Sequence, residues 1–429
     1  MAQYSFSISN YHSISKADIR LNGITVIAGC NGSGKSTIAR WIYSFVNYTN
    51  NFHNLIDRQL VRKLESKLYS MYRILRNSDS LTYSKLRQFK SLSENDLIDD
   101  YSEISAQFEI RVRVFCEIVE KMLSENDTKS FKRWLSQALG YEGEVSVDSM
   151  IDFYNRAMDE LSEEVYIANE RKHSCRIQDL FQFIQKDLDL ITDLPHNIEF
   201  KENGHNLIFD NRFLIPLNLG NAIYIDTPMA LSTKFNADNR IWNDMMNALT
   251  ESYREMPSTA RKIRNRLCRI IGGRIEVYKE EIGDSYDIRY IRSSDNLDIS
   301  INEAATGLKT FTYILRLLEN GYLNENSILL IDEPEAHLHP QWIVEFARIL
   351  VLLHKEVGTT ILLASHNPDM VAALKSISEA EEIDHKVSFY QAILNENTQK
   401  YTYQYLGNSI EEIFESFNIA LNRIKDYGC

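Results

Sequence analysis

The sequence is poor in the residues that cross-link or interrupt a fold. Its five cysteines lie far apart, are odd in number and form no Cys-x-x-Cys pair. A disulfide framework or a cysteine-based zinc site is therefore not expected, and free thiols fit a reducing cytosol. Glycine and proline are also scarce, at 16 and 7 residues of 429, which favours long helices over a loop-rich fold.

The sequence also lacks an uninterrupted apolar run of membrane-spanning length. The stretch "ILVLLHKEVGTTILLAS" is broken by charged and histidine residues, and "MAQYSFSISN" has no basic segment followed by an apolar one. We therefore expect a cytoplasmic protein with no membrane partner. Basic residues number 47 against 60 acidic ones, so any nucleic-acid contact must come from a local basic surface.

The pattern of apolar residues changes twice along the chain, which is long enough for two or three lobes. Residues 1–28 alternate like short strands, and helical spacing over 51–195 predicts a helical insertion. The head would then comprise residues 1–50 and 196–429. Its elements predict an α/β fold with a mixed or parallel sheet, crossover helices and an antiparallel lobe. Helices are predicted at 36–47, 238–271, 307–319, 340–354 and 368–376, and further strands at 273–281, 286–294, 327–331 and 359–365.

The clearest motif is "GCNGSGKST", which matches Gly-x-x-x-x-Gly-Lys-Ser/Thr between a predicted strand and a predicted helix. Gly32 and Gly34 would let the backbone turn closely around phosphate oxygens. Lys35 would bring its charge to the β- and γ-phosphates, and Ser36 would offer a hydroxyl to Mg²⁺. The predicted nucleotide-binding residues of this loop are Gly29, Asn31, Gly32, Ser33, Gly34, Lys35, Ser36 and Thr37.

Two interpretations compete for "IDEPEAHLHP", residues 331–340. Glu335, His337 and His339 stand at alternate positions, as zinc ligands could in an extended segment. Pro334 and Pro340, however, favour a turn, and no distant Cys/His pair completes a tetrahedral set. The zinc interpretation is therefore the weaker one.

The other interpretation starts from the apolar run "SILLI", which ends in two carboxylates. Asp332 could reach Mg²⁺ directly or through water, and Glu333 could polarise an attacking water. The next predicted strand ends in Ser365 and His366. Because His366 follows one crossover later, it could contact the γ-phosphate and hold the water together with Glu333.

A weaker signal is "NEAATGLKTF", residues 302–311, just before the helix that leads to the acidic strand. Thr306 could cap this helix, and the free amides at its start, near Gly307, could bind an anion. The alternative is an ordinary helix start with no ligand.

In this order the motifs resemble those of ATP-binding-cassette-type (ABC-type) P-loop ATPases of the SMC/RecF/OLD group. "DEPEAHLHP" is similar to the OLD-like, phage-defence branch, whereas "AATGLK" departs from the Leu-Ser-Gly-Gly-Gln of transporter subunits. The resemblance implies ATP and Mg²⁺ as ligands and head-to-head dimers with ATP at the interface. It covers roughly residues 1–50 and 200–400.

The resemblance also implies roles for individual residues. Lys35 and Ser36 would act in Walker A, and Asp332 and Glu333 in Walker B. His366 would be the switch histidine. The signature residues Thr306 and Gly307 would act on the nucleotide of a second subunit. The remaining assignments are Leu338 and His339 in the D-loop, residues 224–227 as the Q-loop and Tyr11 as an adenine-stacking aromatic.

No nuclease motif is found: "DLDL" at 187–190 lies in a helical context, and no HNH pattern is present. Chain length and layout are most similar to the PtuA family, the ATPase subunits of Septu and retron antiphage defence systems. That resemblance implies a separate HNH-type nuclease as partner and a regulatory role in antiviral defence. The alternatives are a RecF/SMC-like DNA-repair or DNA-tethering ATPase and a scaffold that holds ATP without hydrolysing it.

Two basic segments are candidates for nucleic-acid contact, and the nucleic acid could be retron msDNA or a DNA or RNA target. "ARKIRNRLCRIIGGR", residues 260–274, concentrates six cations, either for nucleic-acid contact or as a solvated helix or subunit interface. Residues 58–76 mix basic and aromatic side chains. Packing against a partner or another lobe is the preferred interpretation here, and nucleic-acid contact is the alternative.

Overall fold

The computed structural model describes residues 2–76, 92, 101–125, 128–141, 144–187, 195, 197–226, 240–279 and 286–415. Its contacts divide the chain into a head, Met1–Asn50 with Ile177–Cys429, and an insertion, Asn51–Arg176. The chain re-enters the head at Ile177, earlier than the sequence-based boundary at 196. Helix α7 (Ile177–Asp187) belongs to the head because it packs on α1 (Lys35–Asn50), with Phe181 against Trp41. Leu188–Leu190 of the "DLDL" segment lie outside the described residues.

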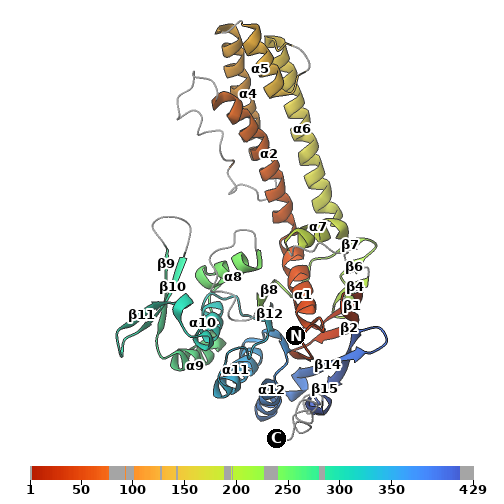
Figure 1. The fold of residues 1–429 in the computed structure, drawn as a ribbon, viewed down its shortest axis with the longest axis vertical. Coiled ribbons are helices and arrows are strands. Elements are labelled where there is room, and N and C mark those ends of the chain that lie inside the picture. Colours follow the sequence, from red (N-terminus) through yellow and green to blue (C-terminus); the bar gives the residue numbers. More distant parts are fainter. Residues whose placement is uncertain are drawn as a thin grey trace. The chain divides into compact units, whose positions relative to one another are not determined.

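A mixed sheet organises the described part of the head (Figure 1). Its ten strands lie in the order β5-β4-β1-β2-β15-β14-β3-β13-β12-β8. The predicted α/β head with a mixed sheet is confirmed. The strands are β1 (Tyr4–Tyr11), β2 (Ile14–Leu21), β3 (Ile24–Ala28), β4 (Asn197–Glu202), β5 (His205–Asn206), β8 (Asn221–Ile225), β12 (Ser327–Asp332), β13 (Thr360–Ser365), β14 (Val387–Asn395) and β15 (Lys400–Gly407).

Strands β8, β12, β13, β3 and β14 run parallel to their neighbours in this order. Their register pairs Ile225 with Ile331, Asp332 with Ala364, and Ser365 with Ala28. The carboxyl ends of four strands therefore meet at one edge, where ligands of open α/β sheets bind. Strands β3, β12 and β13 are buried along their whole length, as expected for apolar runs in a parallel sheet.

Helices cover both faces of the parallel part. Helix α1 packs on one face, against β8, β12 and β13. On the other face, apolar side chains of the strands join a core with α10 (Thr306–Glu319), α11 (Pro340–Leu352) and α12 (Pro368–Ala380). These three helices lie where the sequence places them. Helix α11 continues into one π-helical turn, Leu353–Val357.

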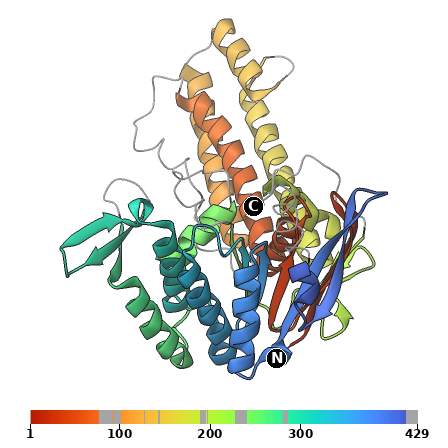
Figure 2. The ribbon, with the colours of Figure 1, turned by 60° about the horizontal axis from the view of Figure 1, so that its bottom comes forward.

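Two expectations about the rest of the head need correction. The single helix predicted at 238–271 is two helices, α8 (Arg240–Thr250) and α9 (Arg261–Ile271). Pro257 lies in the interruption, where its missing N–H and its restriction of the preceding residue disfavour a continuous helix. No strand was predicted after 376, yet β14 and β15 form a hairpin. Figure 2 shows this blue hairpin beside the red N-terminal strands, where β15 pairs with β2.

The predicted antiparallel lobe is present as three strands, β9 (Arg274–Lys279), β10 (Tyr286–Arg292) and β11 (Leu297–Ser300), in the order β11-β10-β9. One face joins the head core through Ile288 and Tyr290. A small antiparallel pair, β6 (Ile208–Phe209) and β7 (Arg212–Phe213), follows β5.

The insertion is helical in its described part. Helices α2 (Phe52–Arg76), α4 (Ser102–Glu125) and α6 (Val147–Ser174) pack on one another, and α5 (Lys129–Leu139) lies between α4 and α6 in the chain. Two ion pairs, Lys63–Glu164 at 2.6 Å and Lys67–Glu160 at 2.6 Å, join α2 to α6. Among the described helices, none is both long and apolar enough to cross a membrane.

Candidate functional site

The phosphate loop connects β3 to α1 at the edge where the strand ends meet. Its backbone takes a left-handed turn at Gly32 and Gly34, with φ of 80° and 97°. A side chain at Gly34 would also approach Ile14, since a Cβ there would lie 2.7 Å from Ile14 Cγ1. Both conformation and space therefore require glycine at position 34. In the rest of the loop, Asn31 is exposed, and Ser36 and Thr37 are half-buried. Gly29 and Ser33 contact the β14–β15 hairpin.

Two residues of the β14–β15 hairpin support this loop, and sequence reasoning missed both. The hydroxyl of Tyr403 donates a hydrogen bond of 2.8 Å to the carbonyl oxygen of Ser33. Ala392 lies so close to Gly29 that a Cβ on the glycine would be 2.7 Å from the alanine Cβ. No local signal marks them, because both contacts depend on strand pairing across more than 350 residues.

Lys35 is the first residue of α1, and its ammonium is held by the loop itself. Nζ donates to the carbonyl oxygens of Gly29, at 2.8 Å, and Cys30, at 2.9 Å. Burial lowers the pKa of Lys35, whereas the nearby carboxylates of Asp332 and Glu333 raise it. The positive charge is thus already placed at the loop.

Asp332 ends the buried strand β12 and faces the start of α1. Burial raises the pKa of Asp332, and a hydrogen bond with Ser36 together with the charge of Lys35 lowers it. The hydroxyl of Tyr224, on neighbouring β8, lies 3.3 Å from Asp332 Oδ2. A buried carboxylate beside a hydroxyl is the hard-oxygen donor set that Mg²⁺ prefers, so Ser36 and Asp332 fit the predicted metal.

Glu333 and His366 come together at the adjoining strand ends. His366 Nδ1 lies 3.5 Å from Glu333 Oε1, and both side chains are partly exposed, by 44% and 35%. Glu333 takes a left-handed backbone conformation, with φ of 49°, and its N–H donates to the Ala364 carbonyl at 2.8 Å. Such a conformation is rare for non-glycine residues and is found where surroundings fix a functional side chain.

Glu335 is the residue of this site whose position the sequence did not reveal. Its side chain is only 3% exposed, and its hydrogen-bond partners lie in the same chain. Oε1 accepts hydrogen bonds of 3.0 Å from Ser365 Oγ and 3.0 Å from the His366 N–H. Burial raises the pKa of Glu335, and these hydrogen bonds lower it.

The zinc interpretation of Glu335, His337 and His339 does not fit their surroundings. Glu335 faces His366, as above, whereas His339 is the N-cap of α11 and its side chain accepts from Gln341 N. His337 has a left-handed φ of 60° within the intervening turn. The three side chains have separate neighbours, and the segment is a turn, as the two prolines indicated.

The signature-like segment is placed as predicted but differs in detail. Thr306 is the first residue of α10 and not its cap, because the N-cap is Ala305 with no side-chain hydrogen bond. Gly307 contacts the helix that follows Walker B: a Cβ there would lie 2.6 Å from Trp342 Cε3 and 3.2 Å from Leu338 Cδ2. The glycine therefore permits close packing between the signature helix and the residue assigned to the D-loop.

The expectation that Tyr11 stacks on adenine is wrong, because Tyr11 is buried. Its ring packs edge-on against Trp41 and is stacked on His12 at a centroid distance of 4.1 Å. The ring is therefore not available as a surface platform. His12, in the turn of this hairpin, is exposed.

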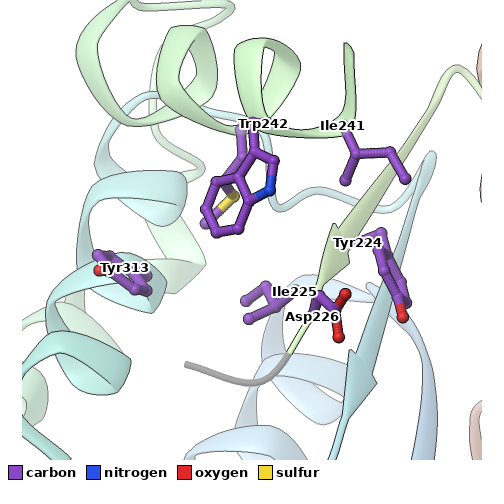
Figure 3. Close-up of a pocket in the computed structure, with 7 residues that line it drawn as sticks. Tyr224, Ile225, Asp226, Ile241, Trp242 and Tyr313 are labelled. Atoms are coloured by element: carbon purple, nitrogen blue, oxygen red, sulfur yellow. The ribbon is translucent and has the colours of Figure 1, made fainter. Parts of the chain in front are cut away.

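The candidate Q-loop begins where β8 ends. Arg40 of α1 forms an ion pair of 2.9 Å with Asp226 and approaches the Tyr224 hydroxyl at 3.4 Å. Figure 3 shows Tyr224 and Asp226 beside a small pocket that Trp242 and Tyr313 also line. With room for about one water molecule, the pocket is too small for a nucleotide. Thr227 lies outside the described residues.

The basic segment 260–274 is partly neutralised. Arg264 pairs with Glu319 at 2.7 Å, Arg266 with Glu345 at 2.6 Å and Arg274 with Glu276 at 2.8 Å. The exposed cations of α9 are Arg261, Lys262 and Arg269. In the segment 58–76, Lys63 and Lys67 form ion pairs with Glu164 and Glu160 of α6, within the insertion itself.

A family model described as an AAA ATPase domain matches residues 1–371. The chain belongs to this AAA ATPase family. This match confirms the P-loop ATPase resemblance drawn from the sequence.

Two curated relatives match shorter parts of this AAA ATPase. It is 32% identical over 146 residues to the Septu protein PtuA of Bacillus thuringiensis, a match that covers 31% of this chain and 35% of PtuA. It is 42% identical over 57 residues to the thiamine import ATP-binding protein ThiQ of Rhizobium meliloti, covering 13% and 24%. The chain thus spans about a third of PtuA and a quarter of ThiQ.

Solved structures similar to this AAA ATPase include an SMC head domain from Thermotoga maritima. That domain is 12% identical, and the match covers 95% of this chain and 99% of the other, with a TM-score of 0.36. An ATP-binding cassette of an ABC transporter in its ADP conformation is 9% identical, with 99% of both chains covered and a TM-score of 0.38.

Proposed function

We propose that this ATPase is the nucleotide-dependent subunit of a cytoplasmic antiphage defence complex and regulates a separate HNH-type nuclease. The observation that carries the proposal is the sequence similarity to Septu PtuA, in a chain whose described site contains the parts of an ATPase and whose sequence contains no nuclease motif. ATP-driven dimerisation of the heads would set the state of the nuclease.

The strand-end cluster can supply each function that ATP hydrolysis needs. The loop amides and Lys35 bind the phosphates. Ser36 and Asp332 would hold Mg²⁺, which when bound offsets charge on the phosphate oxygens. Glu333 accepts a proton from the attacking water, and His366 orients that water against the γ-phosphate.

The position of the signature helix supports the proposed dimer. Thr306 and Gly307 start α10 and would contact the nucleotide of a second subunit in a head-to-head homodimer. Leu338, in the turn after Glu333, contacts Gly307 at this helix start. The next residue, His339, is the N-cap of α11. The turn after Walker B would therefore be shared between two sites.

The test is Glu333→Gln, which keeps the size of the side chain and removes the general base. We expect phosphate release to fall by at least about 100-fold, ATP binding to persist, and light scattering to show an ATP-stabilised dimer. Adding the HNH protein encoded nearest to this gene should give a complex whose DNA cleavage differs between ATP and ADP. Lys35→Ala is the control, because it should lose ATP binding and the dimer together.

Failure of every neighbouring nuclease candidate to bind either variant would refute the regulatory proposal. An alternative function, ATP-dependent DNA tethering of the RecF/SMC kind, is favoured by the exposed cations Arg261, Lys262 and Arg269. Charge reversal at these three should then abolish salt-sensitive duplex binding. Reversal at Arg264 is a poor test of DNA binding, because it would also break the pair with Glu319.

A further inference from the structure

The carboxylate of Glu335 has no assigned role, yet it is the most enclosed acid around the ATPase site. Its side chain is 3% exposed. Burying a charged or polar group is unfavourable unless partners compensate. The partners here are both at the end of β13: Ser365 Oγ and the His366 N–H each donate to Oε1. The second oxygen, Oε2, is buried without a protein partner.

The hydrogen bonds fix the direction of this carboxylate. The N–H of Asn367 donates to Ser365 Oγ at 3.1 Å, so the serine hydroxyl proton is free to point at Glu335. Asn367 is in turn held as the N-cap of α12, since its side chain accepts from the N–H groups of Asp369 and Met370. Oε1 is thereby held at the junction between β13 and α12, where His366 stands.

The same oxygen also faces the imidazole. His366 Nδ1 lies 3.4 Å from Glu335 Oε1 and 3.5 Å from Glu333 Oε1. A nitrogen between two carboxylate oxygens is favoured in its N–H form. Which nitrogen of a histidine carries the proton is set by the hydrogen bond that the other nitrogen can make. Nε2 is then the atom of His366 left for the nucleotide or the attacking water.

We propose that Glu335 is a positioning residue, which holds His366 in the ring orientation and tautomer that ATP hydrolysis requires. This inference rests on the role of His366 in the proposed mechanism. It gives Glu335 a function inside its own subunit, in addition to any contact that the neighbouring turn makes with a second one. Glu335 acts only through His366, and this dependence can be tested.

Glu335→Gln is the informative variant. The glutamine carbonyl can still accept from Ser365 and from the His366 N–H, whereas the negative charge beside Nδ1 is lost. We expect kcat for phosphate release by the full chain to fall by about 10- to 100-fold, with KM and the Kd for ATP unchanged within about twofold. His366→Ala should lower kcat by at least about 100-fold. In the double variant, the loss should equal that of His366→Ala alone.

Two further variants guard against an unspecific effect. Glu345→Gln makes the same chemical change on α11, where the carboxylate pairs with Arg266, and should leave kcat unchanged. Ser365→Ala removes one donor to Oε1 but keeps the Glu335 charge. It should give a smaller loss than Glu335→Gln, again only when His366 is present. Urea midpoints of all variants show whether the head is folded, so that a lower kcat is not mistaken for unfolding.

The outcomes separate this inference from the mechanism on which it rests. If Glu335→Gln keeps full kcat, or if its loss multiplies with that of His366→Ala, the positioning role is refuted and the role of His366 stands. If His366→Ala itself keeps full kcat, both are refuted. Regulation of a nuclease partner does not enter the assay, because phosphate release is measured on this chain alone.

Discussion

Substituting Gly307 by alanine sets two opposing effects against each other. Gly307 lies in the first turn of α10, and alanine is favoured over glycine in a helix by about 1 kcal/mol. The added Cβ, however, would lie 2.6 Å from Trp342 Cε3 and 2.7 Å from Cζ3. Carbon atoms are in optimal contact at about 3.5–4.0 Å, so the indole ring or the helix must move by about 1 Å.

Overpacking of this kind costs about 1–3 kcal/mol. Taking the middle of that range against the helix preference, we expect the free energy of unfolding of the head to fall by about 1 kcal/mol. Urea unfolding followed by tryptophan fluorescence measures the loss, and amide hydrogen exchange along α10 locates it. If the heads dimerise with ATP as proposed, this dimerisation should weaken in parallel.

The variant Trp342→Leu provides the matched control. It removes the ring atoms that a Cβ at position 307 would meet, so Gly307→Ala should cost less in the Trp342→Leu background than in the native chain. If Gly307→Ala raises stability by about 1 kcal/mol, helix preference alone decides the result. The close packing of α10 on Trp342 would then be refuted.

Two other residues give direct tests of the head. Tyr403→Phe removes the hydroxyl that donates to the Ser33 carbonyl oxygen. Because one buried hydrogen bond is worth about 1 kcal/mol, ATP binding should weaken by about fivefold. An unchanged Kd in ATP titrations would contradict this expectation. His354 is buried with Nδ1 3.0 Å from the Thr359 carbonyl oxygen, and burial lowers its pKa from 6.5. Because the unfolded chain then binds the proton more readily, head stability should fall as the pH drops below about 6.5. Between about pH 7.5 and 5.5, the urea midpoint of His354→Gln should fall less than that of the native chain. An equal fall in both proteins would contradict the role of His354.

Local patterns were enough to predict the parts of the site that lie on single strands and loops. "GCNGSGKST" and "SILLIDE" each carry their own context, because an apolar run predicts a buried strand and its end predicts where the polar residues gather. The shared edge for Lys35, Asp332 and His366 then follows from parallel strands. The roles of these residues remain predictions that the variants above can test.

What sequence patterns could not supply are contacts made across strands. Tyr403 reaches the phosphate loop only because β15 pairs with β2. Glu335 is drawn inward by donors on β13 and not by its own neighbours in the chain. A signal existed for Glu335: an acid two residues after Glu333 could have been paired with the Ser-His at the next strand end. Tyr11 failed as an adenine platform for the opposite reason, since Trp41 covers it.

The position of β3 between β13 and β14 also fixes when the nucleotide site can form during synthesis. The phosphate loop leaves the ribosome early, but its two flanking strands begin at Thr360 and Val387, about 330 and 360 residues after Ala28. At roughly 5–20 residues per second this interval is on the order of half a minute. The insertion is complete by Arg176 and can fold first. A nascent or truncated chain that stops before β13 should therefore be unable to bind ATP, so ATP binding marks a chain that has been synthesised at least as far as these flanking strands.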